Sequence, residues 1–249
     1  MSIAAKALVV HMTVGAWTGA KVDPDRSNDL QLVRKQVVPK SAFAGVVKAL
    51  GALRTHFYGH TAPWKDNGDR LLPIVTLVEF LREHTRLRKI FWAEAEMFVA
   101  RHDGVERDRF YVHLSFDMVG DPTQLTLAGV EDQQLDTVKT KLYSELAGRT
   151  ERAQRFVWEK LEQAVSHYSE RLLSGAVFRD STVDNLQQAI RLAPALNFLE
   201  DPELTSLIEI ELRHLLSVSP EQIRKEPQVR VLAGAGAKSC LAMIRRKLR

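Results

Sequence analysis

The chain has 249 residues, of which 45% are hydrophobic and 27% are charged, so it can bury the core of one large domain. Charged residues interrupt its apolar runs well before the roughly 18 residues of a membrane-spanning helix, and the N-terminal apolar run is too short for an export signal. Its single cysteine, Cys240, excludes an intramolecular disulfide and a multi-thiolate zinc site. We therefore expect a cytoplasmic protein without a membrane partner.

The first hundred residues predict one strand and two helices. Residues 6–14 alternate in a period of two and are rich in β-branched side chains, which predicts a half-buried strand. The DPDRSND stretch (23–29) predicts a turn, with a short helix as an option after it. Apolar residues then recur at helical spacing over 39–59 and again over 74–104, so we expect a helix in each range, the second one long.

A second strand and a very long helix follow. Residues 110–119 alternate more clearly than any other segment and predict a strand, whose partner is either the TQLTL segment (123–127) or the strand at 6–14. From Asp132 to about Ser174 the helical spacing continues without a proline. This predicts one helix of roughly 40 residues, or two helices broken at Gly148.

Three N-terminal helix signatures follow in the last quarter of the chain, at Asp180-Ser181, Asp201-Pro202 and Ser219-Pro220. The AGAGA stretch (233–237) predicts a flexible hinge, and the residues from Lys238 onward predict a final helix. The fold class is therefore α+β, mostly α-helical with long helices and a small antiparallel sheet.

The positive charge is concentrated at the end of the chain. The net charge is +4, but residues 223–249 alone hold eight Lys and Arg side chains against Glu226, while the remaining residues hold 27 basic and 30 acidic side chains. We therefore divide the chain into a mainly helical body with a small sheet (1–222) and a basic C-terminal arm (223–249). Such asymmetry is typical of a segment that binds a polyanion.

No motif predicts catalysis, a bound metal or another cofactor. The segment from Gly234 to Ser239 lacks the glycine spacing of a phosphate-binding loop. His56 and His60 are four residues apart, as two metal ligands on a helix would be, but the third ligand would have to be Asp66 or Asp69 and no HExxH pattern is present. We therefore expect a protein that is not an enzyme.

The segment HTAPWKDNGDRLLP (60–73) between the two predicted helices allows two interpretations. Trp64, with Tyr58 before it, places aromatic rings close to Lys65 and Arg70, and proteins offer rings beside cations to unpaired bases and their phosphates. Alternatively, Trp64 fills a gap between helices and the prolines shape a turn. The second interpretation is purely structural.

Four segments resemble a set of uncharacterised bacteriophage proteins: VVHMTVGAWTGAKVD, TAPWKDNGDRLLP, FYVHLSFDMV and FRDSTVDNLQQAIRLAPALN. These segments cover the chain in patches from about residue 6 to 204 and carry no defined chemistry. The chain is also similar, more weakly, to a single-stranded-DNA-binding RNA polymerase cofactor of lytic podoviruses. That resemblance implies non-specific binding of single strands in phage transcription or replication, in the host cytoplasm, by a homo-oligomer with phage RNA polymerase as a partner.

The leading hypothesis is a non-enzymatic single-stranded nucleic-acid-binding protein. The alternative is a phage interaction protein that binds or inhibits a host protein through its helices, and a nucleic-acid-processing enzyme is the third. Rings for stacking and cations for phosphate contacts would form the binding surface. The predicted binding residues are Tyr58, Trp64, Lys65, Arg70, Lys139, Lys141, Arg149, Arg152, Arg155, Arg224, Lys225, Arg230, Lys238, Arg245, Arg246, Lys247 and Arg249.

Overall fold

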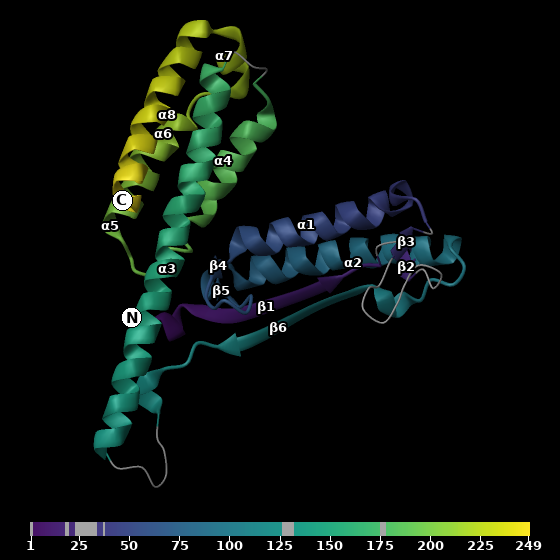
Figure 1. Ribbon diagram of the computed structural model, residues 1–249. Coiled ribbons are helices and arrows are strands. Elements are labelled where there is room, and N and C mark those ends of the chain that lie inside the picture. Colours follow the sequence, from purple (N-terminus) through teal and green to yellow (C-terminus); the bar gives the residue numbers. More distant parts are fainter. Residues whose placement is uncertain (1, 18–19, 23–33, 37, 126–131, 175–177) are drawn as a thin grey trace. The chain divides into compact units, whose positions relative to one another are not determined.

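The computed structural model describes residues 2–17, 20–22, 34–36, 38–125, 132–174 and 178–249 (Figure 1). The fold is α+β and mostly helical, with long helices and a four-stranded antiparallel sheet of strand order β4-β5-β1-β6, so the predicted fold class is confirmed. Among the described residues, none of the helices combines the length and the apolar character that crossing a bilayer requires.

Both predicted strands are present. They are β1 (Ala7–Gly15) and β6 (Tyr111–Met118), and they are neighbours in the sheet, which decides the partner of β6 in favour of the strand at 6–14. The start of the TQLTL segment belongs instead to a short 3-10 helix, η5 (Pro122–Gln124). The rest of that segment, from residue 126, lies outside the described residues.

The chain divides into two compact units. Unit 1 comprises Met1–Val9, Gly59–Thr76 and Asp117–Arg249, and unit 2 comprises Val10–Tyr58 and Leu77–Phe116. Each unit has its own apolar cluster of buried side chains.

Unit 2 is built on the two predicted helices, α1 (Ala44–His60) and α2 (Leu77–Arg101). Buried aromatic side chains recur along α2 at helical spacing, and Phe98 stacks on Phe43 at a ring-centroid distance of 4.3 Å. Short 3-10 helices flank these elements: η2 (Lys40–Phe43), η3 (Ile74–Thr76, in unit 1) and η4 (Arg107–Arg109).

A two-stranded antiparallel ribbon also belongs to unit 2. Its strands are β2 (Ala20–Val22) and β3 (Arg34–Gln36), and Lys21 lies opposite Lys35. The predicted turn at 23–29 and the start of the optional helix after it lie outside the described residues.

Unit 1 is organised around α3 (Asp132–Leu173), a single helix of 42 residues. Gly148 does not break it, so the one-helix alternative is confirmed. No atom lies within 4 Å of where a Cβ on Gly148 would be. The helix tolerates this glycine because the cost of one interior glycine, about 1 kcal/mol relative to alanine, is small beside the packing of its C-terminal half.

Five further helical elements precede the last helix: α4 (Asp180–Leu192), α5 (Pro202–Ser206), the π-helical η6 (Leu207–Leu212), α6 (Arg213–Leu215) and α7 (Pro220–Lys225). The predicted caps at Asp201 and Ser219 are confirmed, because each side chain accepts a hydrogen bond from a backbone N–H of the following turn. The predicted cap at Asp180-Ser181 is wrong, since Arg179 precedes the helix without a side-chain capping bond. A 3-10 turn, η1 (Ile3–Ala5), lies near the N-terminus.

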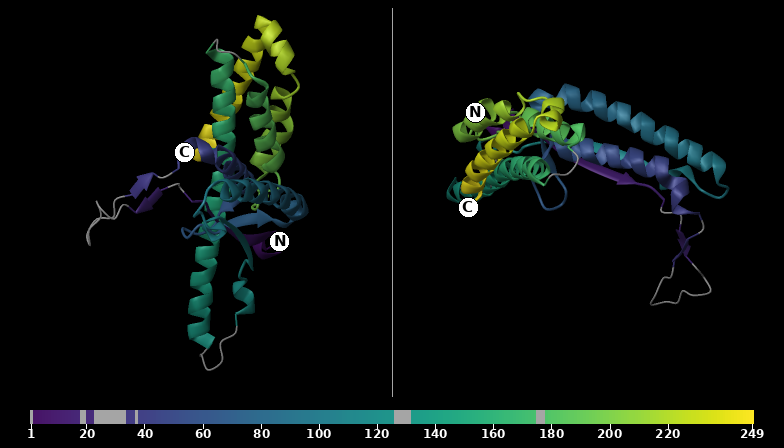
Figure 2. Two further views of the ribbon diagram at one scale, coloured as in Figure 1. Left: turned by 90° about the vertical axis from the view of Figure 1, so that its right-hand side faces the viewer. Right: turned by 90° about the horizontal axis from the view of Figure 1, so that it is seen from above.

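The predicted hinge at 233–237 is wrong. Pro227–Leu248 form one continuous helix, α8, which lies antiparallel beside the C-terminal half of α3 (Figures 1 and 2). Gly234 is buried, and a Cβ added to it would lie 3.0 Å from Leu173 Cδ2, while one on Gly236 would lie 3.1 Å from Leu215 Cδ2. The glycines are there because they let α8 approach its neighbours closely.

The segment at 60–73 forms a hairpin that was not predicted. Its strands are β4 (Ala62–Pro63) and β5 (Arg70–Pro73), and β5 also neighbours β1. The carbonyl oxygen of Asp69 accepts hydrogen bonds from the N–H groups of Trp64 and Lys65, and Gly68 supplies the positive φ of the turn, 92°. Strands of two and four residues are too short to show alternation.

Candidate nucleic-acid interface

Most cations of the segment 223–249 have partners within unit 1. Arg224 forms an ion pair of 2.6 Å with Asp180, and Lys225 forms one of 2.6 Å with Glu221. The Arg230 guanidinium donates hydrogen bonds of 2.7 and 2.8 Å to the carbonyl oxygens of Leu172 and Arg171, which lie at the end of α3. Arg224 and Arg230 thus connect α7 and α8 to residues at the start of α4 and the end of α3, whereas the pair of Lys225 lies within α7.

The last turns of α8 are anchored in the same way. Arg245 pairs with Glu162 of α3 at 2.8 Å, and Lys247 bridges to Asp201 and Glu203 at 3.4 and 3.2 Å. Cations in the last turn also complement the partial negative charge at the C-terminal end of a helix. The +7 charge of the segment is therefore largely balanced by acidic groups elsewhere in unit 1.

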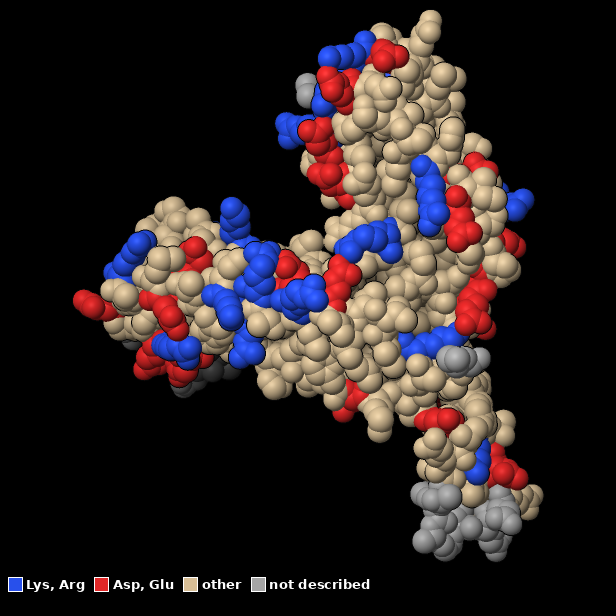
Figure 3. Space-filling model, turned by 180° about the vertical axis from the view of Figure 1, so that it is seen from behind, with Lys and Arg blue, Asp and Glu red and all other residues tan. Residues whose placement is uncertain are grey.

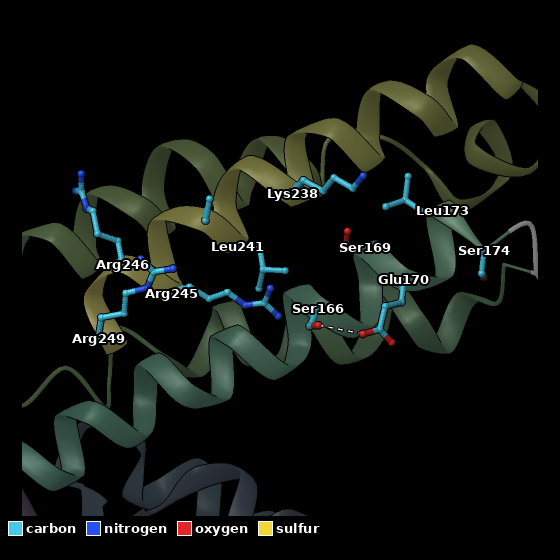
Figure 4. Close-up of a pocket in the computed structure, with 11 residues that line it drawn as sticks. Ser166, Ser169, Glu170, Leu173, Ser174, Lys238, Leu241, Arg245, Arg246 and Arg249 are labelled. Carbon is cyan, nitrogen blue, oxygen red and sulfur yellow. Dashed lines mark hydrogen bonds between the residues drawn. The ribbon is translucent and has the colours of Figure 1, made fainter.

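Three cations of the segment remain, namely Lys238, Arg246 and Arg249. All three are exposed, and within the described part of the chain none forms a hydrogen bond or an ion pair. They line a groove of about 1110 Å³ between α3 and α8 (Figure 4). The groove is lined by Ser166, Ser169, Glu170, Leu173, Ser174, Lys238, Leu241, Ala242, Arg245, Arg246 and Arg249.

The two walls of this groove differ in chemistry. The α8 wall carries the cations, and Figure 4 shows Arg245 extending from α8 toward Ser166 on α3. The α3 wall carries hydroxyl groups and one carboxylate, that of Glu170, which accepts a hydrogen bond of 3.1 Å from Ser166 Oγ. Leu241 and Leu173 supply an apolar surface between them.

The predicted cations of α3 fall into two groups. Arg149 pairs with Glu145 at 3.0 Å, and Arg155 pairs with Glu159 at 3.1 Å while donating to the Leu248 carbonyl oxygen at the end of α8. In contrast, Lys139, Lys141 and Arg152 have no hydrogen-bond or ion-pair partner among the described residues. Arg152 lies about one turn before Arg155 on the same face of α3. It therefore adds an accessible cation on α3 beyond the end of α8.

The hairpin does not offer the predicted stacking surface. Trp64 is only 4% exposed and belongs to the core of unit 1, which supports the packing interpretation and removes this ring from the predicted binding set. Lys65 pairs with Asp69 at 3.4 Å. Arg70 donates to Thr61 and lies 5.2 Å from the centre of the Phe156 ring.

Tyr58, in unit 2, keeps an accessible ring. Its side chain is half exposed, and the ring lies edge-on to that of Phe57 at a centroid distance of 5.4 Å. On the face of the molecule drawn in Figure 3, acidic side chains lie among the basic ones rather than apart from them. The positive charge on this face is therefore partly offset by neighbouring acidic side chains.

Burial shifts the pKa values of the Lys160, His84 and Cys240 side chains. Burial, and then the charge of Arg70, lower the pKa of Lys160 to about 8; its Nζ lies 5.1 Å from the centre of the Phe156 ring. Burial, followed by the charges of His56 and Arg88, lowers the pKa of His84 to about 4. Burial also raises the pKa of Cys240 to about 11, so its thiol is protonated at neutral pH.

The described residues contain no cluster of candidate metal ligands. No three His, Cys, Asp or Glu side chains among them lie close enough together to hold a metal ion. His56 donates through Nε2 to the carbonyl oxygen of Phe80 at 3.0 Å, as a buried histidine in a helix pair does. Comparison with models of protein families, with curated proteins and with solved structures finds no match to this chain.

Proposed function

We propose that this protein binds single-stranded nucleic acid without catalysing a reaction, and that the groove between α3 and α8 is the binding site. The observation that carries the proposal is that Lys238, Arg246 and Arg249 line one groove while having no partners among the described residues. Cations that are already paired inside a protein gain little from a phosphate, whereas unpaired ones release counterions from the strand when they bind it.

The lining of the groove favours a single strand over a duplex. Leu241 and Leu173 offer apolar surface to an unstacked base or a sugar. Beyond the end of α8, Arg152 and Lys141 continue the line of accessible cations along α3. A strand that leaves the groove would follow them.

The biological setting belongs to the same proposal and rests on the resemblance to bacteriophage proteins. Within it, the protein acts in phage transcription or DNA metabolism, in the host cytoplasm, as a homo-oligomer with phage RNA polymerase as a partner. Non-specific strand binding by phosphate contacts suits both roles, because it tolerates any sequence that is being copied.

The test is a fluorescence-anisotropy titration of labelled single strands, with unlabelled duplex as competitor, over about 50 to 200 mM salt. In the triple variant Lys238→Gln, Arg246→Gln, Arg249→Gln we expect affinity to fall about tenfold or more, and the slope of log K against log salt to fall by about 2, since each phosphate contact to a single strand contributes about 0.7.

The matched control is Lys40→Gln, Lys48→Gln, Arg54→Gln, which removes the same charge from exposed positions of unit 2. We expect the control to bind as the wild type does. If both triple variants lose affinity equally, only net charge matters and the groove is not the site.

A second candidate function is binding of a partner protein through the helices. It is favoured by the apolar side chains that α8 exposes near its start, Val231 and Leu232, which are 66% and 72% exposed. Absence of binding to every strand, single or double, would favour this candidate.

A further inference from the structure

The groove between α3 and α8 contains a feature that a simple phosphate site would not have. Glu170 lies among its lining residues, and its carboxylate has no cationic partner in the described part of the chain, because Arg245 pairs with Glu162 instead. A carboxylate beside a phosphate path repels the strand unless it receives hydrogen bonds in return. Its place in the groove therefore points to a donor on the ligand.

The carboxylate is held in a defined position. Ser166 lies one turn before Glu170 on α3, and its hydroxyl donates to one carboxylate oxygen at 3.1 Å, as Figure 4 shows. Each carboxylate oxygen offers two lone pairs, so both oxygens remain able to accept from a ligand. Ser166 thus orients Glu170 without satisfying it.

The bases of an unpaired strand differ in what they offer to a carboxylate. Guanine carries two adjacent donors on its Watson–Crick edge, the ring N1–H and the N2 amino group, which fit the two oxygens of one carboxylate. Cytosine and adenine each present one amino group beside an acceptor nitrogen. Thymine and uracil present a single N–H between two carbonyl oxygens, which a carboxylate repels.

The spacing of the cations leaves room for one base at this point. Lys238 and Arg246 are eight residues apart on α8, which places them about 12 Å apart along the helix axis at 1.5 Å per residue. Leu241 lies between them on the same wall, and Glu170 lies on the opposite wall. A strand whose phosphates contact the cations would bring a base over Leu241 with its edge toward α3.

We propose that Glu170 recognises the Watson–Crick edge of guanine, so that the groove binds single strands with a preference for guanine over thymine or uracil. This inference rests on the proposed binding of single strands in the groove. The preference is modest, because phosphate contacts supply most of the affinity and act on every sequence alike.

The test compares short oligothymidines with the same strands carrying isolated guanines, which cannot form quadruplexes. For the wild type we expect guanine to tighten binding about fivefold or more, the lower range for a bidentate contact to a base. Replacing each guanine by inosine removes the N2 amino group and should abolish most of this gain. Cytosine replacements should give an intermediate affinity.

The variants separate recognition from folding. In Glu170→Gln we expect the guanine and thymine strands to bind with similar affinity and thymine to bind more tightly than to the wild type, because the repulsion is gone. Glu151→Gln removes an exposed carboxylate of α3 that does not line the groove, and should keep the wild-type preference. Thermal melting should be unchanged in both variants, since both side chains are exposed.

The outcomes are distinct. A guanine preference that survives in Glu170→Gln, or equal affinity of the wild type for all strands, overturns the role of Glu170 and leaves the proposed function standing. Absence of binding to every oligonucleotide overturns both.

Discussion

The histidine pair of unit 2 makes the stability of the protein depend on pH in a way that can be calculated. His84 of α2 is 4% exposed, and neither of its ring nitrogens has a hydrogen-bond partner among the described residues. Its ring stacks on Phe80 at 5.7 Å, and Phe80 stacks in turn on His56 of α1 at 4.9 Å. A charge on His84 would therefore be buried, near Arg88 and a second histidine.

The direction and the size of this pH dependence follow from the lowered pKa of His84. His84 has a pKa of about 4 in the folded protein and 6.5 as the reference value, so the unfolded chain takes up a proton at higher pH than the folded protein does. Above pH 6.5 the histidine is neutral in both states and does not lower the free energy of unfolding. As the pH falls from 6.5 to 4 the free energy of unfolding decreases, and below pH 4 this residue changes it no further. With about 1.4 kcal/mol per pKa unit, the loss in free energy of unfolding is about 3 kcal/mol.

The assay is urea unfolding of the wild type and of His84→Leu at several pH values between 7 and 4. We expect the variant to be at least as stable at pH 7, because leucine removes two buried polar atoms that lack partners. Its stability relative to the wild type should then increase by about 3 kcal/mol toward pH 4, since only the wild type must exclude a proton. Parallel curves for the two proteins would refute this explanation.

Three further substitutions test the packing of unit 1 and the helix propensity of α3. Gly234→Val should lower the free energy of unfolding by about 1–3 kcal/mol, because the valine side chain would collide with Leu173. Gly148→Ala should raise it by about 0.5–1 kcal/mol, because alanine favours the helix and its methyl group meets nothing. Chemical denaturation measures both changes. Trp64→Ala should cost about 3–5 kcal/mol in the same assay while strand affinity measured below the melting temperature stays unchanged; lost affinity with unchanged melting would restore the stacking role of this ring.

Local apolar spacing predicted the large elements because it needs only neighbouring residues. The buried side chains of α2 and the alternation of β6 express one face of one element, and that face is visible in the sequence. The hairpin at 60–73 was missed because β4 and β5 are too short for a pattern. Besides β4, β5 has β1 as its second neighbour in the sheet, more than 50 residues earlier. Such pairing is a property of the fold and not of the segment.

The AGAGA stretch illustrates a second limit. Glycine and alanine in alternation are typical of a flexible linker, because neither side chain restrains the backbone. The same residues are also what a helix needs where it crosses another helix closely, and Gly234 against Leu173 is such a place. Composition is equal in the two cases, so only the neighbouring helix distinguishes them.

Which cations are available in the candidate site could not be predicted either, because the ion-pair partners of the others lie far away in the sequence. Summed along the sequence, residues 223–249 form a strongly basic arm, yet Arg245 finds its partner 83 residues earlier at Glu162, and Lys247 finds partners at Asp201 and Glu203. Surface ion pairs of this kind contribute only about 0–1 kcal/mol each to the free energy of unfolding. Their main effect here is that the paired cations of α8 are less available to a ligand. The cations that remain for a ligand are Lys238, Arg246 and Arg249. Truncating the chain at Lys238 would not test these three side chains alone, since it would also remove the buried Cys240 and Ile244 from the core of unit 1. Point substitution of those three side chains is therefore the perturbation that separates binding from folding.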